Sequence, residues 1–349
     1  MKNMKIAFIL PSLKNQGPII VAKDIIEGLI NIVEQIDVYY FDKGEAEVNF
    51  SCDTHLISFY EKIDFNKYDV IHTHMLRPDM YVWFHRKKYH KCKFISTLHQ
   101  IIYDNLKCNY NKFTAFIFEK IWIKILKKQD SIVYLTHIMA NLYKDRIRIP
   151  YQVIYNGRSY NKEKRNNPVE EEYQIIHIKK QFKVIGTHCL LTKRKGVHQS
   201  ILALKYLPDY FFIVVGDGME LESLKNLAKQ ENVYNRCLFL GYKKNAISYL
   251  KYFDVYLATS YSEGFSLSLI ETGQCSLPTV CSNIEIFKEQ YNETEVVFYE
   301  IDNIPSLADA IKKAYNHREQ YATNIYKRAI EDYSIEKMSK QYLELYYKR

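Results

Sequence analysis

Two glutamates, Glu263 and Glu271, lie eight residues apart in the segment DVYLATSYSEGFSLSLIETGQCSLPTVC. An apolar run over 255–258 leads into a polar turn, Gly264 follows the first glutamate, and a stretch with helical spacing carries the second. A proline then opens a second apolar run. The pattern predicts strand, loop, helix and strand, the unit that holds a nucleotide at the carboxyl end of a parallel sheet. Because the start of the helix can bind a phosphate group, the segment predicts a sugar-nucleotide site.

The eight-residue spacing alone is not specific, because the chain has 24 glutamates and the spacing occurs four times. Only the pair at Glu263 and Glu271 lies between two strand-like runs, with Gly-Phe after the first glutamate. The alternative is a solvated helix face that carries two unrelated acids. The surrounding pattern favours the functional interpretation.

The composition is that of a globular protein. The 349 residues are enough for two domains with full cores, and 47% of them are hydrophobic and 26% charged. No apolar run reaches the roughly 20 residues that cross a bilayer, and the N-terminal MKNMKIAFILPSLKN predicts a first strand, not a secretory signal. The seven cysteines are scattered without C-x-x-C spacing, which favours reduced thiols. We therefore expect a cytoplasmic location.

The net charge of +9 is unevenly distributed. Residues 77–148 contain 15 Lys or Arg and 5 Asp or Glu, a net charge of +10, so the rest of the chain has about −1. Such a region suggests an anionic partner, either a membrane surface, a phosphorylated lipid or nucleic acid, although a solvated basic surface is the alternative. No motif that reads RNA or DNA is present, so we do not expect nucleic-acid binding.

Within that basic region, residues 112–128, KFTAFIFEKIWIKILKK, predict an amphipathic helix. We expect one face to be formed by Phe118, Ile121, Trp122, Ile125 and Leu126, with Glu119 and the lysines largely elsewhere. One interpretation is a core helix whose lysines form a solvent-exposed edge. The other is weak contact with anionic lipid, at about 1 kcal/mol per basic residue, which would place the protein peripherally on the inner face of the plasma membrane.

Strand-like and helix-like segments alternate through both halves of the chain, which predicts parallel sheets with helices on both faces. Residues 158–173 are polar and predict the connection between two domains. The expected strands are 5–10, 36–41, 69–72, 93–98, 132–135, 152–155, 183–186, 211–215, 238–240 and 255–258. The expected helices are 21–32, 197–207, 221–229, 246–251, 307–315 and 334–347.

Several motifs occur in the order found in one enzyme family. They are YDVIHTH at 68–74, STLHQ at 96–100, VIYNG at 153–157, KRKG at 193–196, VVGDG at 214–218 and SEGFSLSLIETGQCSLPTV. Over nearly its whole length the chain resembles retaining GT-B-type glycosyltransferases of family 4, group 1, above all the bacterial enzymes that build capsule, O-antigen or lipopolysaccharide.

The resemblance implies an α/β GT-B fold, in which two doubly wound Rossmann-like domains have a cleft between them. It implies an acceptor-binding domain over 1–165, a nucleotide-sugar-binding domain over 174–330, and a helix within 331–349 that packs back on the first domain. The implied reaction moves a hexosyl or N-acetylhexosaminyl group from a UDP-sugar, or another nucleoside-diphosphate sugar, to a glycan or lipid-linked acceptor. Attack is expected from the front face without a cofactor. The sugar, the linkage and the choice between UDP and GDP stay open.

Positive groups around the diphosphate should contribute most to catalysis, because negative charge develops on the diphosphate as it leaves. The chain has no D-x-D, the metal-binding signal of the other transferase fold, so we expect a metal-independent enzyme. Lys195 matches the family lysine that contacts the diphosphate, with a solvated basic turn as the alternative. The arginine usual five residues earlier is replaced by Leu190, and Arg194 or Lys193 could substitute for it.

By the resemblance, Glu271 binds the ribose hydroxyls, for which a carboxylate is a strong acceptor. Glu263 would lie beside the donor sugar and stabilise positive charge at the anomeric carbon. At the start of the predicted helix, backbone groups would face the phosphates. These groups belong to Gly264, Phe265, Ser266 and Leu267.

Five further positions follow from the resemblance. Gly216 and Gly218 form a tight turn after a strand, with a purely structural role as the alternative, and Tyr242 lies in the loop expected to read the base. Gly17 lies in the turn after the first strand, where the family often has two glycines. His99 follows a strand and would reach the donor sugar or the acceptor, although a lone histidine is often structural.

Other functions remain open at this point. Leu190 and the missing second glycine leave room for a catalytically degenerate, transferase-like subunit that binds a nucleotide or glycan. A sugar-nucleotide epimerase of the same fold is a more distant alternative.

Overall fold

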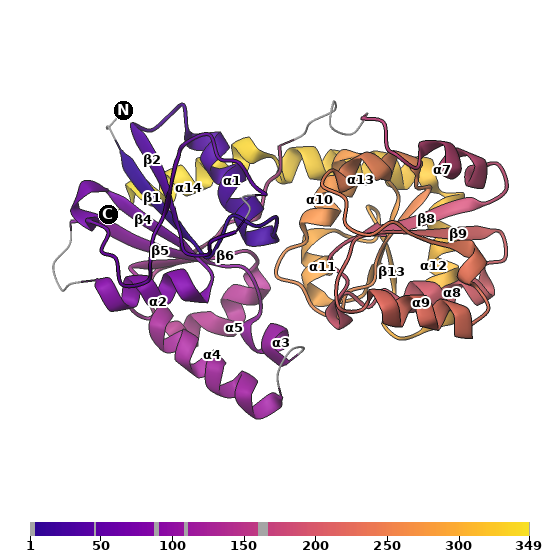
Figure 1. Cartoon of the computed structure of the whole chain (residues 1–349), viewed down its shortest axis with the longest axis horizontal. Coiled ribbons are helices and arrows are strands. Elements are labelled where there is room, and N and C mark those ends of the chain that lie inside the picture. Colours follow the sequence, from indigo (N-terminus) through magenta and orange to yellow (C-terminus); the bar gives the residue numbers. More distant parts are fainter. Residues whose placement is uncertain (1–3, 45–46, 87–90, 108–110, 160–166, 349) are drawn as a thin grey trace. The chain divides into compact units, whose positions relative to one another are not determined.

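The computed structural model of the chain forms two compact units (Figure 1). Unit 1 comprises Met1–Ser159 and Tyr333–Arg349, and unit 2 comprises Tyr160–Asp332. Each unit is a parallel sheet with helices packed against it. The structure describes residues 4–44, 47–86, 91–107, 111–159 and 167–348.

The sheet of unit 1 has seven strands in the order β3-β2-β1-β4-β5-β6-β7, and every neighbouring pair is parallel. The chain order reverses between β1 and β4, the point where open α/β sheets bind ligands. Its strands are β1 (Lys5–Leu10), β2 (Gln35–Tyr40), β3 (Asp53–Leu56), β4 (Val70–His74), β5 (Lys93–Leu98), β6 (Ser131–Tyr134) and β7 (Tyr151–Val153).

Helix α14, yellow in Figure 1, lies beside α1 although the two are at opposite ends of the chain. A side chain at Gly28 of α1 would place its Cβ 2.4 Å from Ser339 Oγ of α14, so these helices pack closely. Arg158 adds an ion pair of 2.6 Å with buried Asp24. The helices of unit 1 are α1 (Gly17–Leu29), η1 (Phe65–Lys67), α2 (Leu76–His85), α3 (Ile102–Lys107), α4 (Lys112–Leu126), α5 (His137–Ile147) and α14 (Ile335–Tyr347).

Unit 2 has a six-stranded parallel sheet in the order β10-β9-β8-β11-β12-β13, which reverses between β8 and β11. These central strands are almost wholly buried, as is usual for sheets covered on both faces. Its strands are β8 (Lys183–His188), β9 (Tyr210–Val215), β10 (Cys237–Phe239), β11 (Val255–Ala258), β12 (Thr279–Ser282) and β13 (Val297–Tyr299).

Helices cover the sheet of unit 2. Gly273 of α10 is packed against α13, because a Cβ there would lie 2.6 Å from the Cβ of Ala329. The α-helices are α7 (Glu172–Lys179), α8 (His198–Ala203), α9 (Leu221–Gln230), α10 (Leu267–Gln274), α11 (Glu285–Gln290), α12 (Ile304–Asn316) and α13 (Arg318–Asp332). The 3-10 turns are η2 (Lys193–Lys195), η3 (Leu204–Tyr206), η4 (Tyr234–Arg236) and η5 (Ala246–Tyr252).

The predicted fold class, two doubly wound Rossmann-like halves, is confirmed. The polar segment 158–173 is less empty of structure than predicted, because α7 begins at Glu172 and Arg158 forms a bridge with Ser334. Residues 160–166 of that segment lie outside the described residues.

Helix α4 turns a different face to the core than predicted. Trp122 and its neighbours Ile125 and Leu126 are buried as expected, but Phe118 and Ile121 are 42% and 46% exposed. Glu119, expected outside, is buried and accepts hydrogen bonds from Arg146 at 2.9 and 2.8 Å. Since the arginine compensates the burial of the acid, the polar residue takes the inner position and the two apolar side chains face outward.

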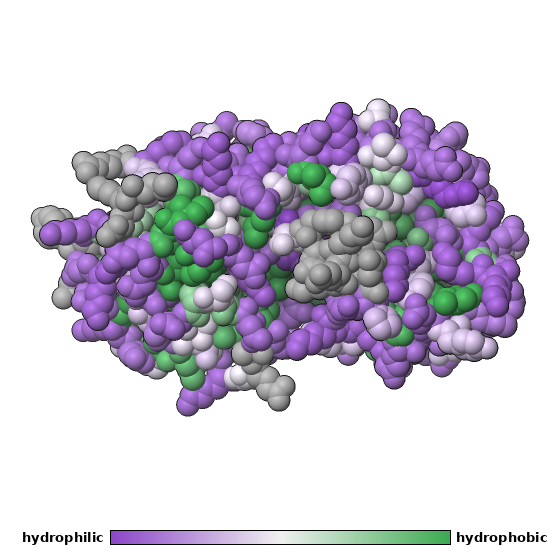
Figure 2. Space-filling model, turned by 90° about the horizontal axis from the view of Figure 1, so that it is seen from above, coloured by the Kyte–Doolittle hydropathy of each residue, from purple (hydrophilic) through white to green (hydrophobic). Residues whose placement is uncertain are grey.

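The face drawn in Figure 2 is largely hydrophilic, and hydrophobic residues gather mainly over unit 1, at the left of the view. Among the helices that the structure describes, none combines the length and the apolar character needed to cross a bilayer.

Candidate active site

The loops that follow β8 and β11, the two strands at the switch point of unit 2, meet at Glu263. Its Oε1 lies 2.6 Å from Lys195 Nζ, its Oε2 lies 2.8 Å from Arg194 Nη1, and the Ser260 hydroxyl donates to Oε1 at 2.7 Å. Burial would raise the pKa of Glu263, but the charges of Arg194 and Lys195 outweigh it and lower the pKa to about 2. The carboxylate is therefore ionised at neutral pH.

Backbone contacts lock these two loops together. The turn η2 ends at Gly196, whose φ is +59° and where a Cβ would lie 2.2 Å from the carbonyl oxygen of Thr259. The Thr259 hydroxyl donates to the Lys195 carbonyl at 3.0 Å, and the Tyr261 N–H donates to the Arg194 carbonyl at 2.8 Å. A glycine at 196 is thus what lets the two cations lie against the loop that carries Glu263.

The N-terminus of α10 lies next to this charge cluster. Ser266 caps the helix by accepting from the Leu269 N–H, and its own backbone is held by Gln290 of α11 through bonds of 3.2 and 2.9 Å. The Ser266 N–H is therefore engaged within the protein, whereas the sequence led us to expect it to face a phosphate. The N–H groups of Leu267 and Ser268 begin the helix and have no intrahelical acceptor.

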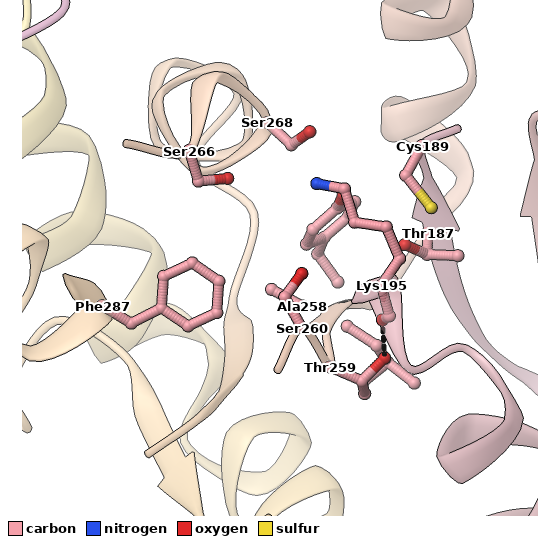
Figure 3. A pocket seen from close by; sticks show the side chains of 11 residues that line it. Thr187, Cys189, Lys195, Ala258, Thr259, Ser260, Ser266, Ser268 and Phe287 are labelled. Carbon is pink, nitrogen blue, oxygen red and sulfur yellow. Dashed lines mark hydrogen bonds between the residues drawn. The ribbon is translucent and has the colours of Figure 1, made fainter. Parts of the chain in front are cut away.

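A small pocket lies between the end of β8, the loop after β11 and the start of α10 (Figure 3). Lys195 crosses it, with its amino group directed toward Ser266 and Ser268 (Figure 3). Thr187 and Cys189 form the β8 side, and Phe287 of α11 lies opposite. A full cation and the positive end of a helix thus face one space, which suits an anion.

Glu271 is on α10, and its Oε2 lies 2.8 Å from Nε2 of His188, the last residue of β8. His188 is 8% exposed, and its Nδ1 is buried without a partner among the described residues. This contact fixes the Glu271 side chain at the carboxyl edge of the sheet. His188 was not among the predicted site residues, because the strand was expected to end at Gly186 and because its bond to Glu271 joins residues 83 positions apart.

Gly216 and Gly218 let the loop after β9 approach the loop after β8. Their φ values are 148° and 151°, where side chains are rarely tolerated. A Cβ at Gly216 would lie 1.9 Å from the Cys189 carbonyl oxygen, and one at Gly218 would lie 2.3 Å from that of Leu191. The glycines are therefore required sterically, and the same backbone borders the pocket through Cys189.

Two neighbouring positions complete the surroundings of the pocket loops. The Gly241 carbonyl accepts from the Gly216 N–H at 2.8 Å, which brings the loop of Tyr242 to this edge, with the tyrosine 53% exposed. Lys243 anchors that loop to Glu171, the residue just before α7, at 2.5 Å. Leu190, at the position of the family arginine, is 64% exposed.

Gly17 and His99 belong to unit 1, while the other predicted site residues belong to unit 2. Gly17 is the first residue of α1, not part of a turn before it, because Pro18 starts the helix early. His99 follows β5, and its Nε2 lies 2.7 Å from Nδ1 of His74. No three or more His, Cys, Asp or Glu side chains of the described chain are grouped so that they could hold a metal ion.

Comparisons with known proteins agree with this architecture. Residues 24–161 match the family model "Glycosyltransferase Family 4", and residues 168–332 match "Glycosyl transferases group 1". The chain is 28% identical to the O-antigen biosynthesis glycosyltransferase WclY of Escherichia coli, over 98% of both chains. It is 26% identical to an Escherichia coli UDP-Gal:alpha-D-GlcNAc-diphosphoundecaprenol alpha-1,3-galactosyltransferase, over 73% of this chain and 68% of the relative.

Among solved structures, Anabaena HepE in complex with UDP-glucose superposes with a TM-score of 0.83 at 17% identity, covering 98% of this chain and 99% of HepE. At this identity the likeness shows the fold. The two family models match in sequence order and together span most of both units. The chain therefore belongs to the glycosyltransferases that join a family 4 domain to a group 1 domain in the GT-B fold.

Proposed function

We propose that this glycosyltransferase moves a sugar, with retention of configuration, from a UDP-sugar to a lipid-linked or glycan acceptor in the assembly of a bacterial surface polysaccharide. The observation that carries the proposal is Glu263, held by Lys195 and Arg194 beside the start of α10. The names of the two relatives support the pathway and the substrates, since one acts in O-antigen biosynthesis and the other uses UDP-Gal and a diphosphoundecaprenol acceptor.

Unit 2 binds the donor in this proposal, and unit 1 binds the acceptor. The diphosphate lies between the N-terminus of α10 and Lys195, whose ammonium group has three N–H donors and uses one on Glu263. Glu271 accepts from the ribose hydroxyls while His188 holds its other side. The loop of Tyr242 lies near the base.

Arg194 supplies the second cation. Its guanidinium lies 2.8 Å from Glu263, next to Lys195, whereas Leu190 offers only an apolar side chain. Two cations and a helix N-terminus give the departing diphosphate the positive field that a metal ion provides in other transferases. This arrangement and the missing D-x-D support a metal-independent hexosyl or N-acetylhexosaminyl transfer.

Glu263 stabilises charge and does not take the proton. A carboxylate with a pKa of about 2 is a weak base, so it is poorly suited to general-base catalysis at neutral pH. Positioned by two cations, it instead faces the positive charge that develops at the anomeric carbon. The acceptor proton then passes to the leaving phosphate oxygen, which is the front-face route to retention. With an α-configured donor this gives an α-linked product, the linkage in one relative's name.

A lipid-linked acceptor lies at a membrane, and we assign weak membrane contact to α4 in the basic region 77–148. Phe113 is 73% exposed, and Phe116 and Ile117 are 45% and 40% exposed. Lys120 lies 4.2 Å from the ring centroid of Phe116, so a cation borders the apolar side chains. Exposed apolar groups bordered by a lysine suit the interface of an anionic inner leaflet and a peripheral position on the cytoplasmic side.

The test begins with a thermal-shift screen of UDP, GDP and their sugars, because a tight donor stabilises the chain by mass action. The best donor is then assayed with a GlcNAc-diphosphoundecaprenol acceptor, with and without a chelator, and the anomeric configuration of the product is read by NMR. We expect the donor to be a UDP-sugar, the product to be α-linked and chelation to have no effect on transfer. Stabilisation by nucleotide without any transfer would instead identify a degenerate binding subunit.

A further inference from the structure

Three histidines gather at the carboxyl edge of the sheet of unit 1. His72 and His74 come from β4, and His99 follows β5. Both ring nitrogens of His72 have partners, since Nδ1 lies 2.7 Å from the Tyr346 hydroxyl and Nε2 lies 2.8 Å from Thr97 Oγ1. His72 is thus a fully satisfied core residue that ties β4 to α14 and β5.

His74 is bonded differently. It is fully buried, its Nδ1 lies 2.7 Å from His99 Nε2, and the two rings stack with their centroids 4.9 Å apart. Its Nε2 is buried and has no hydrogen-bond partner in the part of the chain that the structure describes. His99 is only partly buried, and its Nδ1 has no partner among the same residues. The hydrogen bond between the two rings therefore links the buried, unpaired Nε2 of His74 to the accessible Nδ1 of His99.

Both rings are neutral at pH 7. Burial, followed by the proximity of His72 and His99, lowers the pKa of His74 well below 6.5, and burial lowers the pKa of His99 to about 3. A neutral imidazole has one N–H donor and one acceptor nitrogen, so the bond between the two rings allows two arrangements.

These arrangements differ in what they leave buried. If His99 donates from Nε2, the proton of His74 must be on Nε2, where a buried N–H meets no acceptor. If His74 donates from Nδ1, only an acceptor lone pair is left unmet on its Nε2. Orphaned buried N–H groups are the rarer defect in proteins, so the second arrangement is favoured.

We propose that His74 is a positioning residue that fixes His99 in the tautomer with its proton on Nδ1, so that His99 presents a hydrogen-bond donor and not a base. The identity of the oxygen that accepts this bond, on the donor sugar or on the acceptor, rests on the proposed function. The edge is built to hold His74 in place. Met75, the next residue, has φ 79° and ψ 166°, a conformation rare for a non-glycine residue.

A hydrogen bond from buried Thr73 helps to hold this unusual backbone. Its hydroxyl donates to Asp79 Oδ1 at 2.6 Å, and Trp122 Nε1 donates to the other oxygen of that carboxylate at 2.9 Å. Buried groups from β4, α2 and α4 thus converge on the turn that directs His74 toward His99.

The test is a long-range ¹H–¹⁵N correlation spectrum of the intact chain labelled at histidine, recorded at pH 7.5 without donor. His99 is assigned by the signals that disappear in His99→Gln. The expected pattern is a protonated Nδ1 and an unprotonated Nε2 for His99. A proton on Nε2, or an averaged mixture of tautomers, overturns the proposal, and the wild-type chain alone gives this answer.

His74→Phe then tests the role of His74, because it keeps a stacked ring and removes both nitrogens. We expect His99 to lose its single tautomer, while His198→Phe in unit 2 leaves the pattern unchanged. An unchanged His99 pattern in folded His74→Phe overturns the proposal. In transfer assays the double variant His74→Phe/His99→Phe should be no less active than His99→Phe alone, because His74 acts through His99. If the chain shows no transfer activity, the proposed function is wrong, but the proposal about the His99 tautomer is unaffected.

Discussion

Lys195 Nζ and Glu263 Oε1 lie 2.6 Å apart, although 68 positions separate the two residues in the chain. The bond joins the loops after β8 and β11 across the switch point of unit 2. Their side chains are 17% and 8% exposed, so water screens the pair weakly. A diphosphate bound at the start of α10 would share this lysine with the carboxylate, which links donor binding to the charge at the reacting carbon.

Replacing Glu263 by Gln removes the negative charge and keeps the size of the side chain. We expect kcat to fall by at least about 100-fold, since transition-state charge stabilisation of this kind is worth about that much. The affinity for UDP should be unchanged or higher, because Lys195 and Arg194 become more available to phosphate. Calorimetry with UDP and a transfer assay separate the two effects.

Glu285→Gln is the matched control for that substitution. Glu285 also belongs to a glutamate pair eight residues apart, but it lies exposed on α11 and pairs only with Lys288 at 2.9 Å among the ion pairs that the structure describes. The transfer activity of the Glu285→Gln variant should equal that of the wild type. Full activity in Glu263→Gln would remove this carboxylate from the mechanism.

Gly216→Ala should disrupt the loop beside the pocket. Its Cβ would lie 1.9 Å from a backbone oxygen at a φ of 148°, so the backbone must shift. We expect unit 2 to lose about 1–3 kcal/mol of unfolding free energy and UDP to bind more weakly. Gly44→Ala, where a Cβ meets nothing within 4 Å, serves as the control. Thermal melts with and without UDP measure both, and equal melts for the two variants would contradict the steric argument.

Acid should destabilise unit 1 through His72. Burial lowers the pKa of His72 to about 3 from 6.5. Below pH 6.5 the unfolded chain therefore binds a proton at His72 that the native chain does not bind. Stability therefore falls as the pH drops from 6.5 toward 3, by about 1.4 kcal/mol per pKa unit at most. His74 and His99 act in the same direction. Asp79, whose pKa burial raises to about 6 from 3.8, opposes them between these two values.

Tryptophan fluorescence reads this effect in unit 1 alone, because Trp83 and Trp122 are the only tryptophans of the chain. His72→Phe should be less stable at pH 7.5, having lost two hydrogen bonds, yet its stability should depend less on pH below 6.5. The same change at exposed His137 should leave the slope as in the wild type. Parallel slopes for wild type and His72→Phe would show that the buried ring does not set the acid response.

Membrane contact should depend on the outward side of α4. A triple change to Ser at Phe113, Phe116 and Ile117 should weaken sedimentation with anionic liposomes by about tenfold or more, since burying even one apolar side chain is worth about 1.5–3 kcal/mol. High salt should weaken wild-type binding as well. The control carries the same number of changes at exposed apolar residues of unit 2, namely Tyr173, Met219 and Tyr234. Equal binding of both triple variants would exclude α4 as the contact.

The elements that the sequence predicts best are the buried strands. β1, β5 and β11 have the predicted bounds, because nearly every residue in them is buried and a proline or a polar residue follows each strand. β3 was missed because all four of its residues are exposed, which leaves no apolar signal. The face of α4 was wrong because the burial of Glu119 depends on Arg146, 27 positions away.

Some residues of the candidate site could also be located from the sequence, and others could not. Glu263, Lys195 and the start of α10 could be located because each lies in a local motif next to a strand. His188 and Gln290 could not, because they act through partners 83 and 24 positions away, on Glu271 and on Ser266. Spacing along the chain carries no information about such contacts. The tautomer of His99 likewise follows only from the burial of His74.

The most direct measurement is a crystal structure of the chain with UDP. We expect the diphosphate to contact Lys195 Nζ and the N–H groups of Leu267 and Ser268, and the ribose hydroxyls to donate to Glu271. A nucleotide bound in unit 1, or in unit 2 with its ribose away from Glu271, would contradict this expectation.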